Sequence, residues 1–180
     1  MRYTTTVRRL MRTALLPLLM PLPIVVSGQM PTPPTACASP VQRQFDFWIG
    51  QWEVFTPDGR KAGENTIEAV HAGCVLRESW RGRGNFEGTS LNSADPTSGR
   101  WVQHWVDNQG GRLFLAGGLQ GAQMALASVN DPALRSGSGR LDRITWTPLE
   151  GGAVHQLWES SSDAGKTWAV AFDGKYVRKP

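Results

Sequence analysis

Histidine and cysteine, the side chains that most often bind transition metals, are scarce in this chain: 3 and 2 among 180 residues. His71, His104 and His155 form no His-x-His or His-Glu-x-x-His pattern, and neither cysteine has a partner at zinc spacing. The chain also lacks a nucleophile elbow, a phosphate-binding loop and a Gly-x-Gly-x-x-Gly sequence. We therefore expect no metal site and no cofactor, with haem held by a single histidine as the alternative.

An excess of positive charge is also missing once the start of the chain is set aside. Four of the 19 basic side chains lie in residues 1–28, which contain no acidic one, so 15 bases and 15 acids remain beyond them. A domain with equal numbers of acidic and basic side chains lacks the net positive charge that attracts nucleic acid or an anionic membrane surface. We expect neither as a partner.

Residues 1–28 have the charge and hydropathy order of a secretory signal peptide. Arginines at positions 2, 8, 9 and 12 precede an apolar run over residues 14–26, and Val26-Ser27-Gly28 offers small residues for cleavage before Gln29. The run is too short and too interrupted by proline for a membrane span. We expect a periplasmic or secreted protein with a Pro-rich linker over residues 29–44 and one domain over residues 45–180.

Cys37 and Cys74 are the two cysteines of a chain expected in an oxidising compartment. The simplest interpretation is a disulfide, whose closed loop would contribute about 3–4 kcal/mol in the chain-entropy model. The alternative is a lipidated Cys37 following Pro34-Thr35-Ala36.

Most of the domain consists of short segments that alternate apolar and polar residues and end at glycine-rich turns. Such segments are typical of half-buried strands, and no helix-period segment exceeds one turn. Short connections predict antiparallel neighbours, and closure would remove exposed edges. We therefore predict an all-β fold: a single antiparallel up-and-down β-barrel of about ten strands, with a helical turn at residues 45–50 closing one end. The expected strands are residues 52–55, 62–70, 74–81, 86–93, 100–107, 113–116, 122–129, 141–147, 153–160 and 167–178, and a longer polar loop covers residues 130–139.

The segment Ser161–Trp168 resembles the Asp-box hairpin, Ser-x-Asp-x-Gly-x-Thr-Trp, of sialidases and related propellers. A propeller needs one copy for each blade, and this chain has one copy. We interpret it as a structural hairpin in which the aspartate caps backbone amides.

Alternation with period two also predicts which side chains share the barrel interior. Two strands carry a glutamine followed two residues later by a tryptophan, and a third carries a glutamate in the same relation. Indole walls with a few polar groups are typical of a small-ligand pocket. The alternative is that the tryptophans fill a tight core. The six expected ligand-binding residues are Glu78, Trp80, Gln103, Trp105, Gln156 and Trp158.

Glu78 has a second interpretation, because a carboxyl group beside indoles can have a raised pKa and act as an acid or base. It could equally pair with an arginine such as Arg178, or lie at the barrel rim.

Several segments together resemble a family of exported bacterial proteins in the calycin (lipocalin-like) group. The resemblance implies a barrel of about ten strands with an aromatic cavity, and it implies no activity. The segments that carry it are Phe45–Trp52, Gly73–Trp80, Trp101–Asp107, Ile144–Pro148, Gln156–Ser160, Ser162–Trp168 and Asp173–Tyr176.

Two classes of function follow from these observations. The first is an exported protein that binds a small hydrophobic or aromatic molecule. The second is a cofactor-independent isomerase or hydrolase that uses Glu78 as acid or base. A role in envelope assembly is a third interpretation.

Overall fold

The structure is a computed structural model that describes residues 37–128 and 139–180. The expected signal peptide, the first half of the expected linker and nearly all of the polar loop over residues 130–139 lie outside the described residues.

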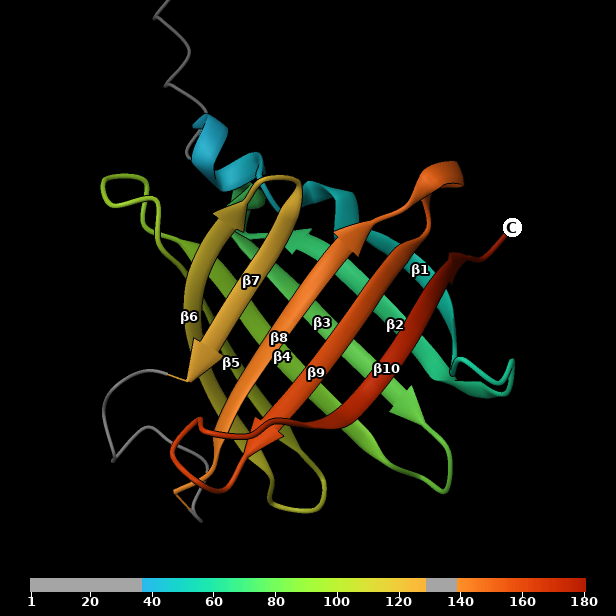
Figure 1. Ribbon diagram of the computed structural model, residues 1–180. Helices are drawn as coiled ribbons and strands as arrows, with labels where there is room; N and C mark the ends of the chain where they lie inside the picture. Colours follow the sequence, from blue (N-terminus) through green and yellow to red (C-terminus); the bar gives the residue numbers. More distant parts are fainter. Residues whose placement is uncertain (1–36, 129–138) are drawn as a thin grey trace, which may run out of the picture. The chain divides into compact units, whose positions relative to one another are not determined.

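The ten strands close into one antiparallel barrel in which each strand pairs with its neighbours in sequence (Figure 1). The ring closes where β1 pairs with β10, with Trp52 opposite Arg178 and Val54 opposite Tyr176. The predicted all-β, up-and-down architecture is confirmed. The strands are β1 (Gly50–Phe55), β2 (Lys61–Val70), β3 (Val75–Gly82), β4 (Glu87–Ala94), β5 (Trp101–Asp107), β6 (Arg112–Gln120), β7 (Gln123–Ser128), β8 (Leu141–Pro148), β9 (Val154–Ser161) and β10 (Ala169–Arg178).

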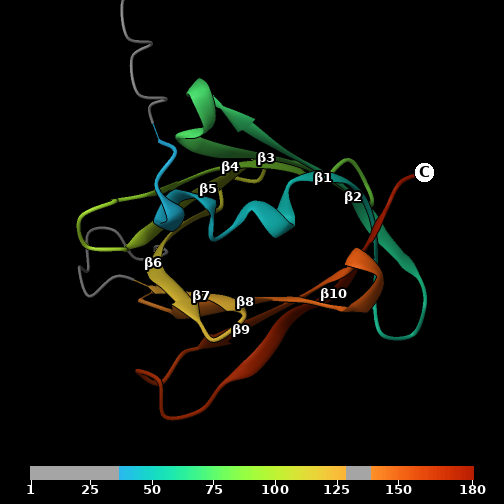
Figure 2. The same ribbon diagram turned by 90° about the horizontal axis from the view of Figure 1, so that it is seen from above.

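One end of the ring is filled by aromatic side chains from the segment that precedes β1. Two 3-10 helices, η1 (Pro40–Arg43) and η2 (Asp46–Trp48), lie across this end, as Figure 2 shows from above. The Phe45 ring stacks on Trp48 at 4.8 Å between centroids and meets Trp101 and Trp146 edge-on at 5.6 and 5.2 Å. Trp52 Nε1 donates to the Trp48 carbonyl at 2.9 Å. The predicted helical turn therefore closes the barrel by packing indoles, which bury large apolar areas.

A disulfide between Cys37 and Cys74 ties this N-terminal segment to the start of β3. The predicted pairing is confirmed, and it leaves Cys37 no free thiol for lipidation. Arg43 donates to the Gly73 carbonyl next to the bridge, and the Gln42 side chain is buried. Residues 40–43, which the sequence places in the linker, are thus packed on the barrel.

The short helices η3 (His71–Gly73) and η4 (Glu150–Gly152) connect β2 to β3 and β8 to β9. The connection from β9 to β10 is the Asp-box hairpin. Asp163 accepts hydrogen bonds from the Thr167 amide at 2.9 Å, the Thr167 hydroxyl at 2.6 Å and the Ser161 hydroxyl at 2.7 Å. These bonds hold the pKa of Asp163 at about 2. The motif has the structural role that the sequence predicts.

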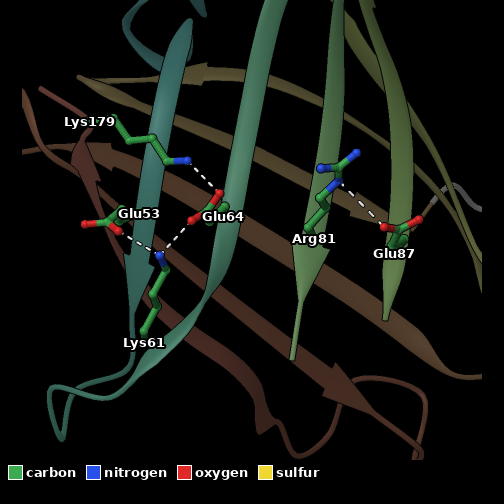
Figure 3. Close-up of polar contacts among 6 residues, drawn as sticks. All are labelled: Glu53, Lys61, Glu64, Arg81, Glu87 and Lys179. Atoms are coloured by element: carbon green, nitrogen blue, oxygen red, sulfur yellow. Dashed lines mark hydrogen bonds and ion pairs between the residues drawn. The ribbon is translucent and has the colours of Figure 1, made fainter. Parts of the chain in front are cut away.

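On the outer face, a network of four charged side chains lies at the barrel seam, where β1 and β10 meet (Figure 3). Lys61 donates to Glu53 and to Glu64, both at 2.7 Å, and Lys179 donates to the other oxygen of Glu64 at 2.6 Å. The network thereby connects β1, β2 and the segment that follows β10.

Candidate ligand cavity

The other end of the barrel contains a cavity of about 250 Å³. Trp146 forms the floor of this cavity, and the other side of its ring packs against Phe45 and Trp48 at the closed end. The mouth of the cavity lies at the turns that follow β3 and β5. An apolar cavity of about 150 Å³ is large enough for benzene, so this one has room for one or two fused rings. The lining residues are Ala62, Glu78, Trp80, Gly82, Arg83, Phe86, Gln103, Trp105, Asp107, Leu113, Ile144, Trp146, Gln156, Trp158, Phe172 and Tyr176.

All six residues that the alternation places inside the barrel are part of this lining. They come in pairs from β3, β5 and β9, and each pair points inward because residues two apart share a face of the strand. The strand register brings polar side chains opposite one another, with Glu78 opposite Ser90 and Asn92 opposite Gln103.

The tryptophans divide between packing and cavity. Trp48, Trp52, Trp101 and Trp146 are fully buried in the core at the closed end, whereas Trp80, Trp105 and Trp158 are only partly buried around the cavity. Tight packing and cavity lining thus both occur among the tryptophans, each mainly at one end of the barrel.

The indoles of Trp105 and Trp158 are held by carboxylates. Trp105 Nε1 donates to Asp107 at 3.1 Å, and Trp158 Nε1 donates to Asp142 at 2.8 Å. Arg140 pairs with Asp142 at 3.2 Å, and its guanidinium lies 5.6 Å from the centre of the Trp158 ring. Because the N–H groups are satisfied, the ring faces are left to line the cavity.

A chain of hydrogen bonds crosses the interior beside the cavity. Asn65 donates to Glu78 Oε1 at 2.7 Å, and the Ser90 hydroxyl donates to Glu78 Oε2 at 2.6 Å. At one side the chain continues through Asn92, which donates to Ser90 at 2.8 Å and accepts from Gln103 at 2.9 Å.

At its other side the same chain reaches the Tyr176 hydroxyl, which lies 3.3 Å from Asn65 Nδ2 and donates to Gln156 Oε1. The amide nitrogen of Gln156 donates to no group of the residues that the structure describes. Gln156 therefore offers a ligand one free N–H₂ group, which is the kind of polar contact that orients a molecule in an apolar pocket.

Glu78 is buried and both of its oxygens accept bonds from neutral donors. Burial raises the pKa of this carboxyl group, while the Ser90 and Asn65 hydrogen bonds lower it in part. The suggested pairing with Arg178 is wrong, as is a place at the rim. Arg178 instead donates to the Ile49 carbonyl at 3.0 Å and lies 4.4 Å over the Trp52 ring, at the closed end of the barrel.

Several cavity residues were not predicted from the sequence, although some of them carried a usable signal. Phe172 and Tyr176 share the inward parity of β10, so alternation could have identified them. Ala62 could not be found in this way. It faces the cavity from a β-bulge, because β1 pairs Val54 with Gly63 but Phe55 with Lys61.

Over residues 37–128 and 139–180 there is no group of three or more histidine, cysteine, aspartate or glutamate side chains arranged to hold a metal ion. Among the same residues, no helix has the length and apolar character needed to cross a membrane.

No protein-family model matches the chain, and no curated protein matches it significantly. Chemically, this cavity can bind a flat apolar molecule between indole faces and orient it through the free N–H₂ group of Gln156.

Proposed function

We propose that this chain is an exported barrel protein that binds a small hydrophobic or aromatic molecule between Trp80, Trp105 and Trp158. The observation that carries the proposal is the uneven filling of one barrel. Trp48, Trp52 and Trp101 are fully buried at the closed end and do not line the cavity, whereas Trp80, Trp105 and Trp158 surround about 250 Å³ of space above Trp146. Protein interiors are normally close-packed, so a cavity of this size lined by aromatic faces suits a ligand.

Export is part of this proposal. It is supported by the charge and hydropathy order of residues 1–28 and by the Cys37–Cys74 disulfide, since such bonds persist in oxidising compartments. Membership of the exported calycin-like family is likewise proposed, and the ten-strand barrel agrees with what that resemblance implies.

Isothermal titration calorimetry with naphthylmethanol, an uncharged two-ring probe, tests the binding. The wild-type protein should bind it with one site, and Ala62→Phe should abolish binding by filling the cavity. Ala127→Phe is the matched control, because Ala127 is exposed on β7 and the same ring there leaves the cavity unchanged. Binding that survives Ala62→Phe, or the absence of any binding, would refute the proposed site.

Glu78 supports a second candidate function, a cofactor-independent hydrolase or isomerase. The observation in its favour is a buried carboxyl group with a raised pKa in the lining of the cavity. Such groups are frequent at catalytic sites. A naphthyl acetate hydrolysis assay tests it: turnover by the wild-type protein should disappear in Glu78→Gln, while naphthylmethanol binding is retained. Equal rates in the two proteins would eliminate Glu78 as the acid or base.

A further inference from the structure

Three side chains in the cavity lining carry a formal charge: Glu78, Arg83 and Asp107. Glu78 lies in the hydrogen-bonded interior, and its oxygens are occupied by Asn65 and Ser90. Among the lining residues that the structure describes, Arg83 and Asp107 are the charged ones at the mouth, where a ligand meets them on entering.

The Asp107 carboxylate already accepts hydrogen bonds from groups in and beside its own turn. One carboxylate oxygen accepts from the Gln109 and Gly111 amides at 3.0 and 2.8 Å, and the other accepts from Trp105 Nε1 at 3.1 Å. Three N–H donors stabilise this negative charge, and the carboxylate therefore needs no cationic partner from a ligand.

The Arg83 guanidinium, by contrast, makes no hydrogen bond and no ion pair with the residues that the structure describes. Arg81, two residues earlier, differs: it lies outside the barrel and faces Glu87 at 3.6 Å (Figure 3). A cation with five N–H donors at the mouth of an aromatic cavity matches a carboxylate or another planar acidic group.

The turn that carries Arg83 is held in place. Gly82 N donates to the Phe86 carbonyl at 2.7 Å, and Asn108 Nδ2 from the neighbouring turn donates to the Asn85 carbonyl at 2.7 Å. Phe86 also packs against Trp105, with 6.5 Å between ring centroids. The backbone of the turn that carries Arg83 is thus held at the lip of the cavity, and the exposed Arg83 side chain projects from it.

The deep part of the cavity, unlike its mouth, favours an uncharged group over an anionic one. Its polar side chains are Glu78, Gln103, Gln156 and Tyr176, and no cation lies among the described lining residues at that depth. An anionic group placed there would be desolvated beside a carboxyl group, at a high cost in free energy.

We infer that the ligand of this cavity is a planar aromatic acid, with its rings between the indoles and its acidic group paired with Arg83 at the mouth. This inference depends on the proposed binding function and adds the charge and the orientation of the ligand. Room for one or two fused rings sets the size of the class.

Calorimetric titrations with three probes of matched shape test the inference: naphthoate, naphthylmethanol and naphthylmethylamine. The wild-type protein should bind the anion most tightly and the cation most weakly. Arg83→Gln should weaken naphthoate binding about fivefold, the scale of a partly exposed ion pair, and leave naphthylmethanol binding unchanged. Arg81→Gln, the matched control, should leave all three affinities unchanged.

The outcomes separate the inference from the function on which it depends. If naphthylmethanol binds at least as tightly as naphthoate, or if Arg83→Gln leaves naphthoate binding unchanged, the acidic ligand is refuted and the binding cavity stands. An equal loss in Arg81→Gln also refutes it, because the effect would then be one of general surface charge. If the wild-type protein binds none of the three probes, the inference and the proposed function fail together.

Discussion

Gly88 on β4 lies directly against the indole of Trp105 on β5. A β-carbon at position 88 would lie 2.1 Å from Trp105 Cζ2 and 2.3 Å from Cη2, distances at which the ring has to move. A β-carbon at Gly63 would likewise lie 2.8 Å from Trp80 Cζ2, and it would also lie 2.4 Å from the Arg81 carbonyl oxygen. Two of the three indoles at the cavity thus keep their positions because a neighbouring strand carries glycine.

We expect Gly88→Ala to push the Trp105 ring out of its place and into the cavity. Overpacking of this kind costs about 1–3 kcal/mol of the free energy of unfolding, measured by urea denaturation. Naphthylmethanol binding should weaken as well, because the displaced ring occupies the space of the ligand.

Two controls identify the ring contact as the cause. Thr89→Ala changes the next residue, which is exposed on the outer face, and should affect neither stability nor binding substantially. In a Trp105→Ala background, Gly88→Ala should cost less, because the clashing ring is gone. Equal costs in the two backgrounds would show that the indole is not what requires glycine.

Glu78 should make stability fall as pH rises. Its folded pKa lies above the ordinary value of 4.5, so the native state holds a proton that the unfolded state releases. The stabilisation is complete below about pH 4.5 and is lost up to the raised folded pKa, at about 1.4 kcal/mol for each pH unit in that window.

Glu78→Gln imitates the protonated carboxyl group, since its amide can accept from Asn65 and donate to Ser90. In urea denaturation from pH 5 to pH 8, the variant should gain stability relative to the wild-type protein as pH increases. A difference that is constant with pH, or that changes in the opposite direction, would contradict a buried carboxyl group with a raised pKa.

Loss of the Cys37–Cys74 disulfide should lower the free energy of unfolding by about 3–4 kcal/mol, because the bridge closes a loop with a sequence separation of 37. The double variant Cys37→Ser/Cys74→Ser in urea denaturation measures this cost. Mass spectrometry of the unreduced, alkylated wild-type protein should recover one linked pair of peptides. Two alkylated thiols would overturn the assignment.

Glu64 at the barrel seam gives the opposite pH dependence to Glu78. Hydrogen bonds from Lys179 and Lys61 hold its pKa at about 2, so its contribution is present above about pH 4.5 and is lost as pH falls through 2. Because the network is exposed, Glu64→Gln should lower the urea midpoint only slightly at neutral pH, and the difference should shrink in high salt. A large, salt-independent loss would show that Glu64 acts through packing.

The fold could be predicted from the sequence because nearly every strand has its own alternation and ends at its own turn signal. The segment over residues 100–107 illustrates this: its inward set of Trp101, Gln103, Trp105 and Asp107 follows from period two alone. The Asp-box hairpin was equally predictable, because its hydrogen bonds are local to eight residues.

Two parts of the site depend on how strands pair and pack with one another, which the alternation within a single strand does not reveal. Asn65, Ser90 and Asn92 lie on strands without a cavity aromatic, and only the register shows that they connect Glu78 to Gln103. Which tryptophans fill the closed end and which line the cavity is also a tertiary property, since it depends on which end of the barrel the N-terminal segment covers. Even so, the two Gln-x-Trp pairs and the one Glu-x-Trp pair were sufficient to group six residues of the cavity lining before any strand was paired.

The indole N–H signals of the eight tryptophans offer the most direct test of the cavity. In a ¹H–¹⁵N correlation spectrum recorded during titration with naphthylmethanol, the signals of Trp80, Trp105 and Trp158 should shift most. The signals of Trp52 and Trp168, which do not line the cavity, should stay in place. Shifts confined to the cavity indoles are the result that this account predicts. No shift at Trp105 and Trp158, or equal shifts at Trp168, would contradict a ligand site inside the barrel.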